Sequence, residues 1–144
     1  MSIVAYTIGR LPKGVKNMPG GKGYGLGKGR RRGQRKMFFL QSCLLVLLHR
    51  EPGYGYSLMD GLQEFGFQPD QMDISIIYRA LRSLEADGLV SDSWDDSSFG
   101  PQRRVYTITP QGEAILDEWM KNLRQRRKEI ETLEAAYDAV KSSN

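Results

Sequence analysis

Residues 73–112 read DISIIYRALRSLEADGLVSDSWDDSSFGPQRRVYTITPQG, and this stretch decides the fold. Its first half carries apolar side chains at helical spacing, which are Ile74, Ile77, Leu81 and Leu84. The spacing predicts an amphipathic helix over residues 74–87 with these four side chains facing the core. Asp73 is a good N-cap for this helix, and Gly88 is a good residue to end it.

A β-hairpin is expected directly after this helix. Residues 89–94 and 103–108 are predicted to be paired strands, and the DDSSFGPQ segment between them holds a glycine and a proline suited to a turn. Arg103 and Arg104 begin the returning strand. A helix with a polar outer face, followed by a hairpin with arginines at its mouth, is typical of a winged helix-turn-helix.

The outward face of the 74–87 helix is short-chained and basic. It carries Ser75, Ile76, Arg79, Arg82 and Ser83. Such a face suits the major groove of double-stranded DNA, where arginine binds guanine edges, serine bonds to a base or a phosphate, and isoleucine contacts a thymine methyl group. Arg103 and Arg104 are expected to reach the phosphates or the minor groove beside it. The sequence therefore predicts a DNA reader with its wing over residues 89–108.

Two plainer interpretations stay open. A helix face with two arginines is also an ordinary solvated surface, and an exposed hairpin needs no partner. Asp92, Asp95 and Asp96 would repel phosphate, so the wing interpretation places them on the side facing away from DNA. The alternative function is a winged-helix module that binds protein through its acidic body, without specific DNA binding.

Two further helices are expected before residue 73. Residues 37–50 are apolar on nearly every side, which predicts a buried helix that ends before the following Pro-Gly pair. A shorter helix is expected over residues 56–65, with Gly66 as its left-handed cap. The predicted DNA-binding domain spans residues 37–109.

A long helix is expected from residue 110 to residue 140, with Thr109 as N-cap and Pro110 in the first position. Its apolar residues fit a heptad. One seam position holds Leu116, Leu123, Ile130 and Tyr137, and the other holds Trp119, Leu133 and Val140. Arg126 interrupts the second series. At 1.5 Å per residue the helix spans roughly 45 Å, too long for a three-helix body to cover. Residues 110–144 are therefore predicted to form a homodimer interface, and packing back on the same domain is the alternative.

The positive charge is concentrated at the N-terminus. Residues 1–36 hold ten Lys or Arg and no acid, so this segment carries a charge of +10. The rest of the chain carries −6, which gives the net charge of +4. Nine glycines leave it little apolar surface to offset the entropy of ordering, so a flexible arm is expected. We expect this arm, including Arg35 and Lys36, to contact neighbouring phosphates. The alternative is a solubilising extension, or one from a misplaced start codon, with Met18 or Met37 as the first residue.

Residues for catalysis or metal binding are few. The chain has one cysteine, Cys43, and one histidine, His49, so neither a nucleophilic triad nor a metal site can be assembled. No enzyme activity and no cofactor are expected. The apolar run at 37–48 is shorter than the roughly 20 residues that cross a bilayer. A single cysteine excludes an internal disulfide, and a reduced cytoplasmic location is expected.

Three motifs together resemble the PadR-like transcriptional regulators, over about residues 38–120. They are PGYGYSLM at 52–59, SIIYRALRSLEADGLV at 75–90 and RRVYTITPQG at 103–112. The resemblance implies a mainly α (α+β) fold: a winged helix-turn-helix domain, a two-stranded wing and one long C-terminal dimerisation helix. It also implies a homodimer that binds pseudo-palindromic operator DNA, usually as a repressor. A small molecule sometimes releases such a repressor from its operator.

The resemblance further implies that Tyr56, Ser75, Tyr78 and the hairpin arginines lie near DNA. Both tyrosines would donate hydroxyls to phosphates, with a place at the edge of the core as the alternative. Trp119 has a second interpretation, as a surface on which a flat ligand stacks between subunits. Two features depart from the family pattern: Arg79 stands where many members have proline, and the basic glycine-rich arm is not part of it.

Overall fold

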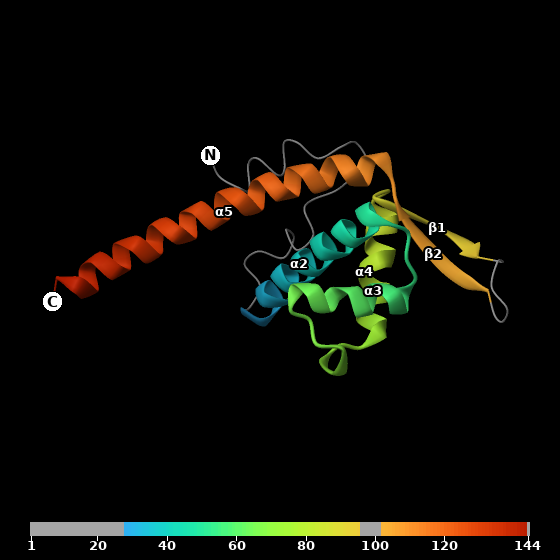
Figure 1. Ribbon diagram of the computed structural model, residues 1–144, viewed down its shortest axis with the longest axis horizontal. Coiled ribbons are helices and arrows are strands. Elements are labelled where there is room, and N and C mark those ends of the chain that lie inside the picture. Colours follow the sequence, from blue (N-terminus) through green and yellow to red (C-terminus); the bar gives the residue numbers. More distant parts are fainter. Residues whose placement is uncertain (1–27, 96–101, 144) are drawn as a thin grey trace.

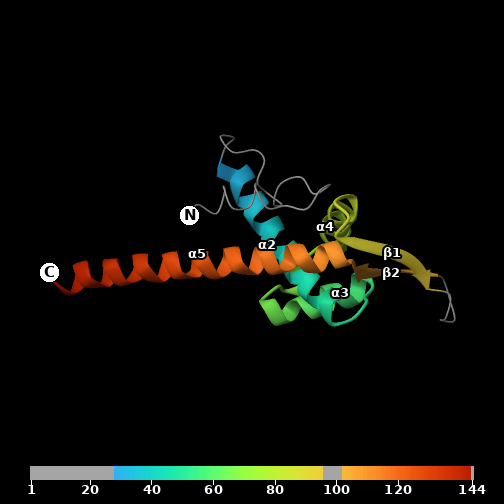
Figure 2. The same ribbon diagram turned by 90° about the horizontal axis from the view of Figure 1, so that it is seen from above.

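The computed structural model describes residues 28–95 and 102–143. Along the chain its elements are α2 (Lys28–Arg50), α3 (Gly55–Gly61), η1 (Leu62–Phe65), η2 (Pro69–Gln71), α4 (Ile74–Ala86), β1 (Val90–Asp95), β2 (Arg103–Ile108) and α5 (Pro110–Ser142). Helices α2, α3 and α4 form one body, and the β1–β2 hairpin projects from one end of it (Figure 1). Helix α5 starts beside the hairpin, crosses α2 and extends well beyond the body (Figure 2). This is the predicted winged helix-turn-helix with a long C-terminal helix.

Local sequence signals set the end of η1 and both ends of α4. The Asp73 carboxylate accepts a hydrogen bond of 3.0 Å from the backbone N–H of Ser75, which confirms the predicted cap. Gly88 follows α4 with a φ of 78°, and Gly66 follows η1 with a φ of 95°; glycine adopts both readily. The helix predicted over residues 56–65 is therefore present, but its second half is the 3-10 helix η1.

Helix α2 differs from the sequence prediction at its start. It begins at Lys28, nine residues before the expected position, so the prediction of a flexible arm over residues 1–36 is wrong for residues 28–36. Arginine, lysine and glutamine are good helix formers, and they extend a helix whose apolar half is anchored in the core. Residues 1–27 lie outside the described residues.

The core lies where α2, α4, the hairpin and the first turns of α5 meet. Its largest fully buried side chains are Leu44, Leu45, Leu62, Ile77, Leu81, Leu84, Leu89, Tyr106, Ile115 and Trp119, with Gln41 among them. Three of the four apolar residues predicted for α4 are among these, and Ile74 is partly buried. The Gln41 side-chain amide donates to the carbonyl oxygen of Ala80 at 3.1 Å, which ties α2 to α4.

The hairpin is a two-stranded antiparallel sheet, and Gly53 forms an isolated bridge to its second strand. Its register places Asp92 opposite Tyr106 and Trp94 opposite Arg104. On the other edge of β2, Gly53 and Tyr106 exchange two backbone hydrogen bonds, of 3.1 and 2.8 Å. The segment before α3 is thereby fixed to the base of the wing.

Helix α5 divides into a packed part and an exposed part. The Thr109 hydroxyl accepts from the N–H of Gly112 at 2.9 Å and donates to the carbonyl of Gly88 at 2.7 Å, which confirms the cap. The Trp119 ring is fully buried and meets Phe38 edge-on, with ring centroids 5.1 Å apart. The large side chains exposed farther along α5 are Ile130, Leu133, Tyr137 and Val140.

This division corrects the predicted dimer seam. Leu116 and Trp119 were assigned to a contact with a second copy, but both are buried within the chain, because α2 lies across the first turns of α5. Leu123 is partly buried, and the seam that remains uncovered starts beyond it. No helix within residues 28–95 and 102–143 is long and apolar enough to cross a membrane.

Candidate nucleic-acid interface

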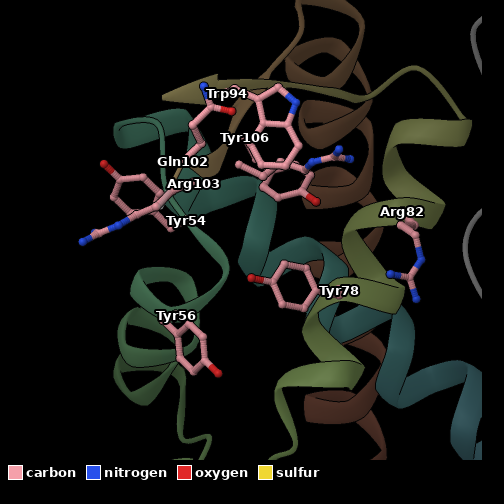
Figure 3. A pocket seen from close by; sticks show the side chains of 9 residues that line it. Tyr54, Tyr56, Tyr78, Arg82, Trp94, Gln102, Arg103 and Tyr106 are labelled. Atoms are coloured by element: carbon pink, nitrogen blue, oxygen red, sulfur yellow. The ribbon is translucent and has the colours of Figure 1, made fainter. Parts of the chain in front are cut away.

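A pocket of about 560 Å³ opens between the start of α3, the middle of α4 and the hairpin (Figure 3). It is lined by five aromatic residues, three arginines and a glutamine: Tyr54, Tyr56, Tyr78, Trp94, Tyr106, Arg82, Arg103, Arg104 and Gln102. Tyr56, Tyr78, Arg82, Arg103 and Arg104 are the predicted site residues that the fold brings together here. The pocket combines cationic groups with hydroxyl donors and flat apolar walls.

Helix α4 supplies Tyr78 and Arg82, with Tyr78 lying between Tyr56 and Arg82 in the view of Figure 3. Tyr78 approaches the start of α3 very closely, since a Cβ atom built on Gly55 would lie 2.6 Å from its ring and its hydroxyl. Only glycine at position 55 admits this approach. The Tyr56 side chain is 65% exposed at the pocket rim, and so is not part of the core edge.

Each hairpin arginine is held by an aromatic ring, with an acid close by. Arg104 forms an ion pair of 2.9 Å with Asp92, and its guanidinium lies 4.7 Å from the centre of the Trp94 ring. Arg103 lies 5.0 Å from the centre of the Tyr54 ring. The Tyr54 hydroxyl donates a 2.8 Å hydrogen bond to Asp95. Cation–π contacts of this kind restrict where each guanidinium points.

Two acidic residues of β1 contact residues that line this pocket. Asp92 pairs with Arg104, and Asp95 accepts from Tyr54, so neither is a detached surface charge; Asp96 lies outside the described residues. The hydrogen bond to Asp95 raises the pKa of Tyr54, which keeps its hydroxyl protonated. A hydrogen bond to Asp92 raises the pKa of Glu85, on α4. Burial raises the pKa of Tyr106.

The remaining predicted residues lie outside the pocket. Ser75, Arg79 and Ser83 are exposed on α4, as predicted, whereas Ile76 is half-buried and packs against the core. Arg35 and Lys36 are exposed on α2. The N-terminal part of that helix lies far from the hairpin (Figures 1 and 2).

Sequence reasoning did not identify four of the pocket residues, which are Tyr54, Trp94, Gln102 and Tyr106. A partial signal was present, because the GYGY segment alternates glycine with tyrosine and Trp94 ends one predicted strand while two arginines begin the other. The described residues hold no group of acids, cysteines and histidines able to bind a metal ion. Burial raises the pKa of Cys43 to about 12, so its thiol stays protonated at neutral pH.

Comparison with known families decides the identity of the domain. The model of the transcriptional regulator PadR-like family matches residues 44–118, just over half of the chain. The chain belongs to the PadR-like family. The match covers most of the pocket-forming part of the chain, from the middle of α2 into α5. The family is one of transcriptional regulators and not, in general, of enzymes.

Solved structures agree with this placement of the PadR-like chain. It is similar to a PadR-like transcription factor from Bacteroides fragilis, with 27% identity, a TM-score of 0.62, and coverage of 71% of this chain and 96% of the other. A conserved protein described as a potential transcriptional factor has 38% identity, a TM-score of 0.62, and coverage of 72% and 90%.

The structure of Bacillus subtilis PadR in complex with operator DNA shares the fold, at 24% identity and a TM-score of 0.50, over 58% of this chain and 48% of that one. No curated protein matches the chain.

Proposed function

We propose that this PadR-like protein is a homodimeric, sequence-specific DNA-binding repressor that acts in the cytoplasm. Helix α4 enters the major groove of a pseudo-palindromic operator, and the hairpin flanks the same site. Ser75 and Arg79 on the exposed face of α4 read base edges, with Ile76 at its margin. Bacillus subtilis PadR, which has this fold, is described in complex with operator DNA.

The pocket is the observation that carries the proposal. Tyr56, Tyr78 and Arg82 present two hydroxyls and a guanidinium beside the exposed face of α4, and Arg103 and Arg104 add two cations from the hairpin. Hydroxyls, guanidinium groups and flat walls at one place suit the sugar–phosphate backbone that borders a major groove.

A quantitative DNA titration tests the proposal. The protein is titrated on fragments of its own upstream region and on random duplex at fixed salt, and preferential retention of an upstream fragment is expected. Arg79→Ala should weaken operator binding by roughly 1–3 kcal/mol and relax base preference at one position. Arg127→Ala, which removes an exposed arginine from α5, is the matched control and should leave base preference unchanged.

Two outcomes would contradict this placement. Retention of neither fragment would leave a winged-helix module that binds protein as the better account. Equal loss of affinity by Arg79→Ala on operator and on random duplex would show that Arg79 contacts phosphate only.

Residues outside the pocket have separate roles in the proposal. The α5 residues Leu123, Ile130, Leu133 and Tyr137 form the dimer seam, with Leu116 and Trp119 supporting it from the core. Because Trp119 is fully buried, the proposal gives it no part in stacking an effector. Arg35 and Lys36 bind phosphates beyond the pocket, and replacing both with neutral residues should lower the log–log salt slope of DNA binding by up to about 0.9 for each phosphate that is no longer neutralised.

A further inference from the structure

Tyr54 connects the body of the domain to both strands of the hairpin. Its hydroxyl donates the 2.8 Å hydrogen bond to Asp95 on β1. Its ring lies against the guanidinium of Arg103 on β2, 5.0 Å from the ring centre (Figure 3). Asp95 and Arg103 are opposite each other in the register and form the last described pair of the hairpin. One side chain from outside the sheet therefore contacts both strands at the outer end of the wing.

The backbone of Tyr54 is itself fixed to the body. Its N–H donates to the Ser57 hydroxyl at 2.9 Å, and its carbonyl accepts from the N–H of Leu58 at 2.9 Å, which hold it at the start of α3. The preceding residue, Gly53, exchanges the two backbone hydrogen bonds with Tyr106 at the base of the hairpin. Tyr54 is thus a fixed point from which its side chain reaches the outer end.

The base and the outer end of the hairpin are well separated along β2. Tyr106 is tied at the base, and Arg103 lies three residues away, about 10 Å at the rise of a strand. The hairpin has two strands and projects from the body (Figure 1), and a two-stranded ribbon has little stability of its own. The contact with Tyr54 at the outer end therefore restricts where Arg103 can lie.

We propose that Tyr54 is a positioning residue for Arg103: it holds the outer end of the wing against the body, so that the Arg103 guanidinium stays in the pocket that it shares with Arg82. The inference rests on the proposed function, in which Arg103 meets the DNA backbone beside α4, and it gives Tyr54 itself no contact with DNA. The affinity for DNA then depends on the fraction of molecules in which the wing is held in this position.

This role accounts for an acidic residue beside a wing arginine. Asp95 repels phosphate, so its charge alone would weaken DNA binding. Its carboxylate accepts the hydrogen bond from Tyr54, and its register partner is Arg103. By fixing β1 to Tyr54, Asp95 helps to fix the strand that carries Arg103, and this offsets the repulsion.

A double-mutant cycle tests whether Tyr54 acts through Arg103. Tyr54→Phe keeps the ring and removes the hydroxyl that bonds to Asp95. Fluorescence anisotropy at fixed salt, with the upstream fragment that the titration retains, should show about 2- to 10-fold weaker binding, and no weaker than that of Arg103→Ala. In the Arg103→Ala background the same replacement should change the affinity less than about twofold, because the residue that Tyr54 positions is gone.

Tyr56→Phe is the matched control. It removes a hydroxyl from the next tyrosine of the same PGYGYSLM motif, which is proposed to contact DNA directly. Its loss of affinity should be the same factor in the wild type and in the Arg103→Ala background.

Two replacements of Asp95 keep the inference testable if Tyr54→Phe fails to fold. Asp95→Asn and Asp95→Ala both remove the charge that repels phosphate, but asparagine retains a side-chain oxygen that can accept from the Tyr54 hydroxyl. Asp95→Asn should therefore bind the fragment about 2- to 10-fold more tightly than Asp95→Ala. Equal affinities of these two variants would contradict the inference.

Three further outcomes decide the matter. The inference is wrong if Tyr54→Phe folds and binds as the wild type does, or if it loses the same factor in the Arg103→Ala background. Wild-type affinity of Arg103→Ala would also overturn it, and would leave the proposed reading by α4 in place. A wild-type protein that retains no fragment would overturn the proposed function itself, and the inference with it.

Discussion

Replacing Leu133 with alanine should weaken the dimer strongly and leave the fold of the domain intact. Leu133 is 68% exposed on α5, so about two-thirds of its side chain is available for burial against a second copy. Full burial of a leucine side chain contributes roughly 1.5–3 kcal/mol, which leaves about 1–2 kcal/mol per copy. A two-fold symmetric interface counts each substitution twice. The expected loss is therefore about 2–4 kcal/mol, or roughly a 30- to 1,000-fold rise in the dimer dissociation constant.

Sedimentation equilibrium over a range of protein concentrations measures this constant directly. Glu131→Ala is the matched control, because it changes a neighbouring exposed residue of α5 to the same side chain, and glutamate and leucine have similar helix propensities. The control should dissociate at nearly the wild-type concentration. Equal dissociation constants for Leu133→Ala and the wild type would refute the argument that the exposed part of α5 is a dimer seam. A wild-type protein that stays monomeric at micromolar concentration would refute it as well.

The remaining predictions concern close contacts of the domain. Gly112→Ala should lower the free energy of unfolding by about 1–3 kcal/mol or more, because a Cβ atom there overlaps the carbonyl oxygen of Leu89. Urea titrations measure this change. An unchanged urea midpoint would contradict the packing of α5 on the hairpin. Thr109→Ala should lower the free energy of unfolding by about 1 kcal/mol, because it removes the N-cap of α5. Thr109→Ser keeps a hydroxyl and should lower it much less, as thermal unfolding of the two variants would show. Gly55→Ala should displace the Tyr78 ring and weaken DNA binding more than it lowers stability. If the variant and the wild type bound the operator with equal affinity, this ring would not contact DNA.

Much of the fold was predictable because its signals are local. The period of α4, the Asp73 cap and the Thr109 cap are each contained within a few residues, and all three are confirmed. The start of α2 was not predictable in this way. Glycine and arginine together suggested a disordered segment, but a helix continues through residues 28–36 because its C-terminal half is already fixed in the core.

The seam of α5 shows a limit of pattern reasoning. Trp119 and Leu133 occupy the same heptad position, yet the first is fully buried within the chain and the second is largely exposed. The sequence of α5 does not distinguish a neighbour in the same chain from one in a second copy. The difference is set by the path of α2, which crosses only the first turns of α5 (Figure 2).

The pocket required contacts between segments distant in sequence, and the PGYGYSLM motif provides them. Gly53 pairs with Tyr106 through two backbone hydrogen bonds, which fixes the motif to the hairpin. Gly55 accommodates the Tyr78 ring, which fixes it to α4. Tyr54, between these glycines, covers an arginine of the hairpin. The glycines of the motif therefore hold the wing and the reading helix in one arrangement, and this arrangement brings their arginines to a single pocket.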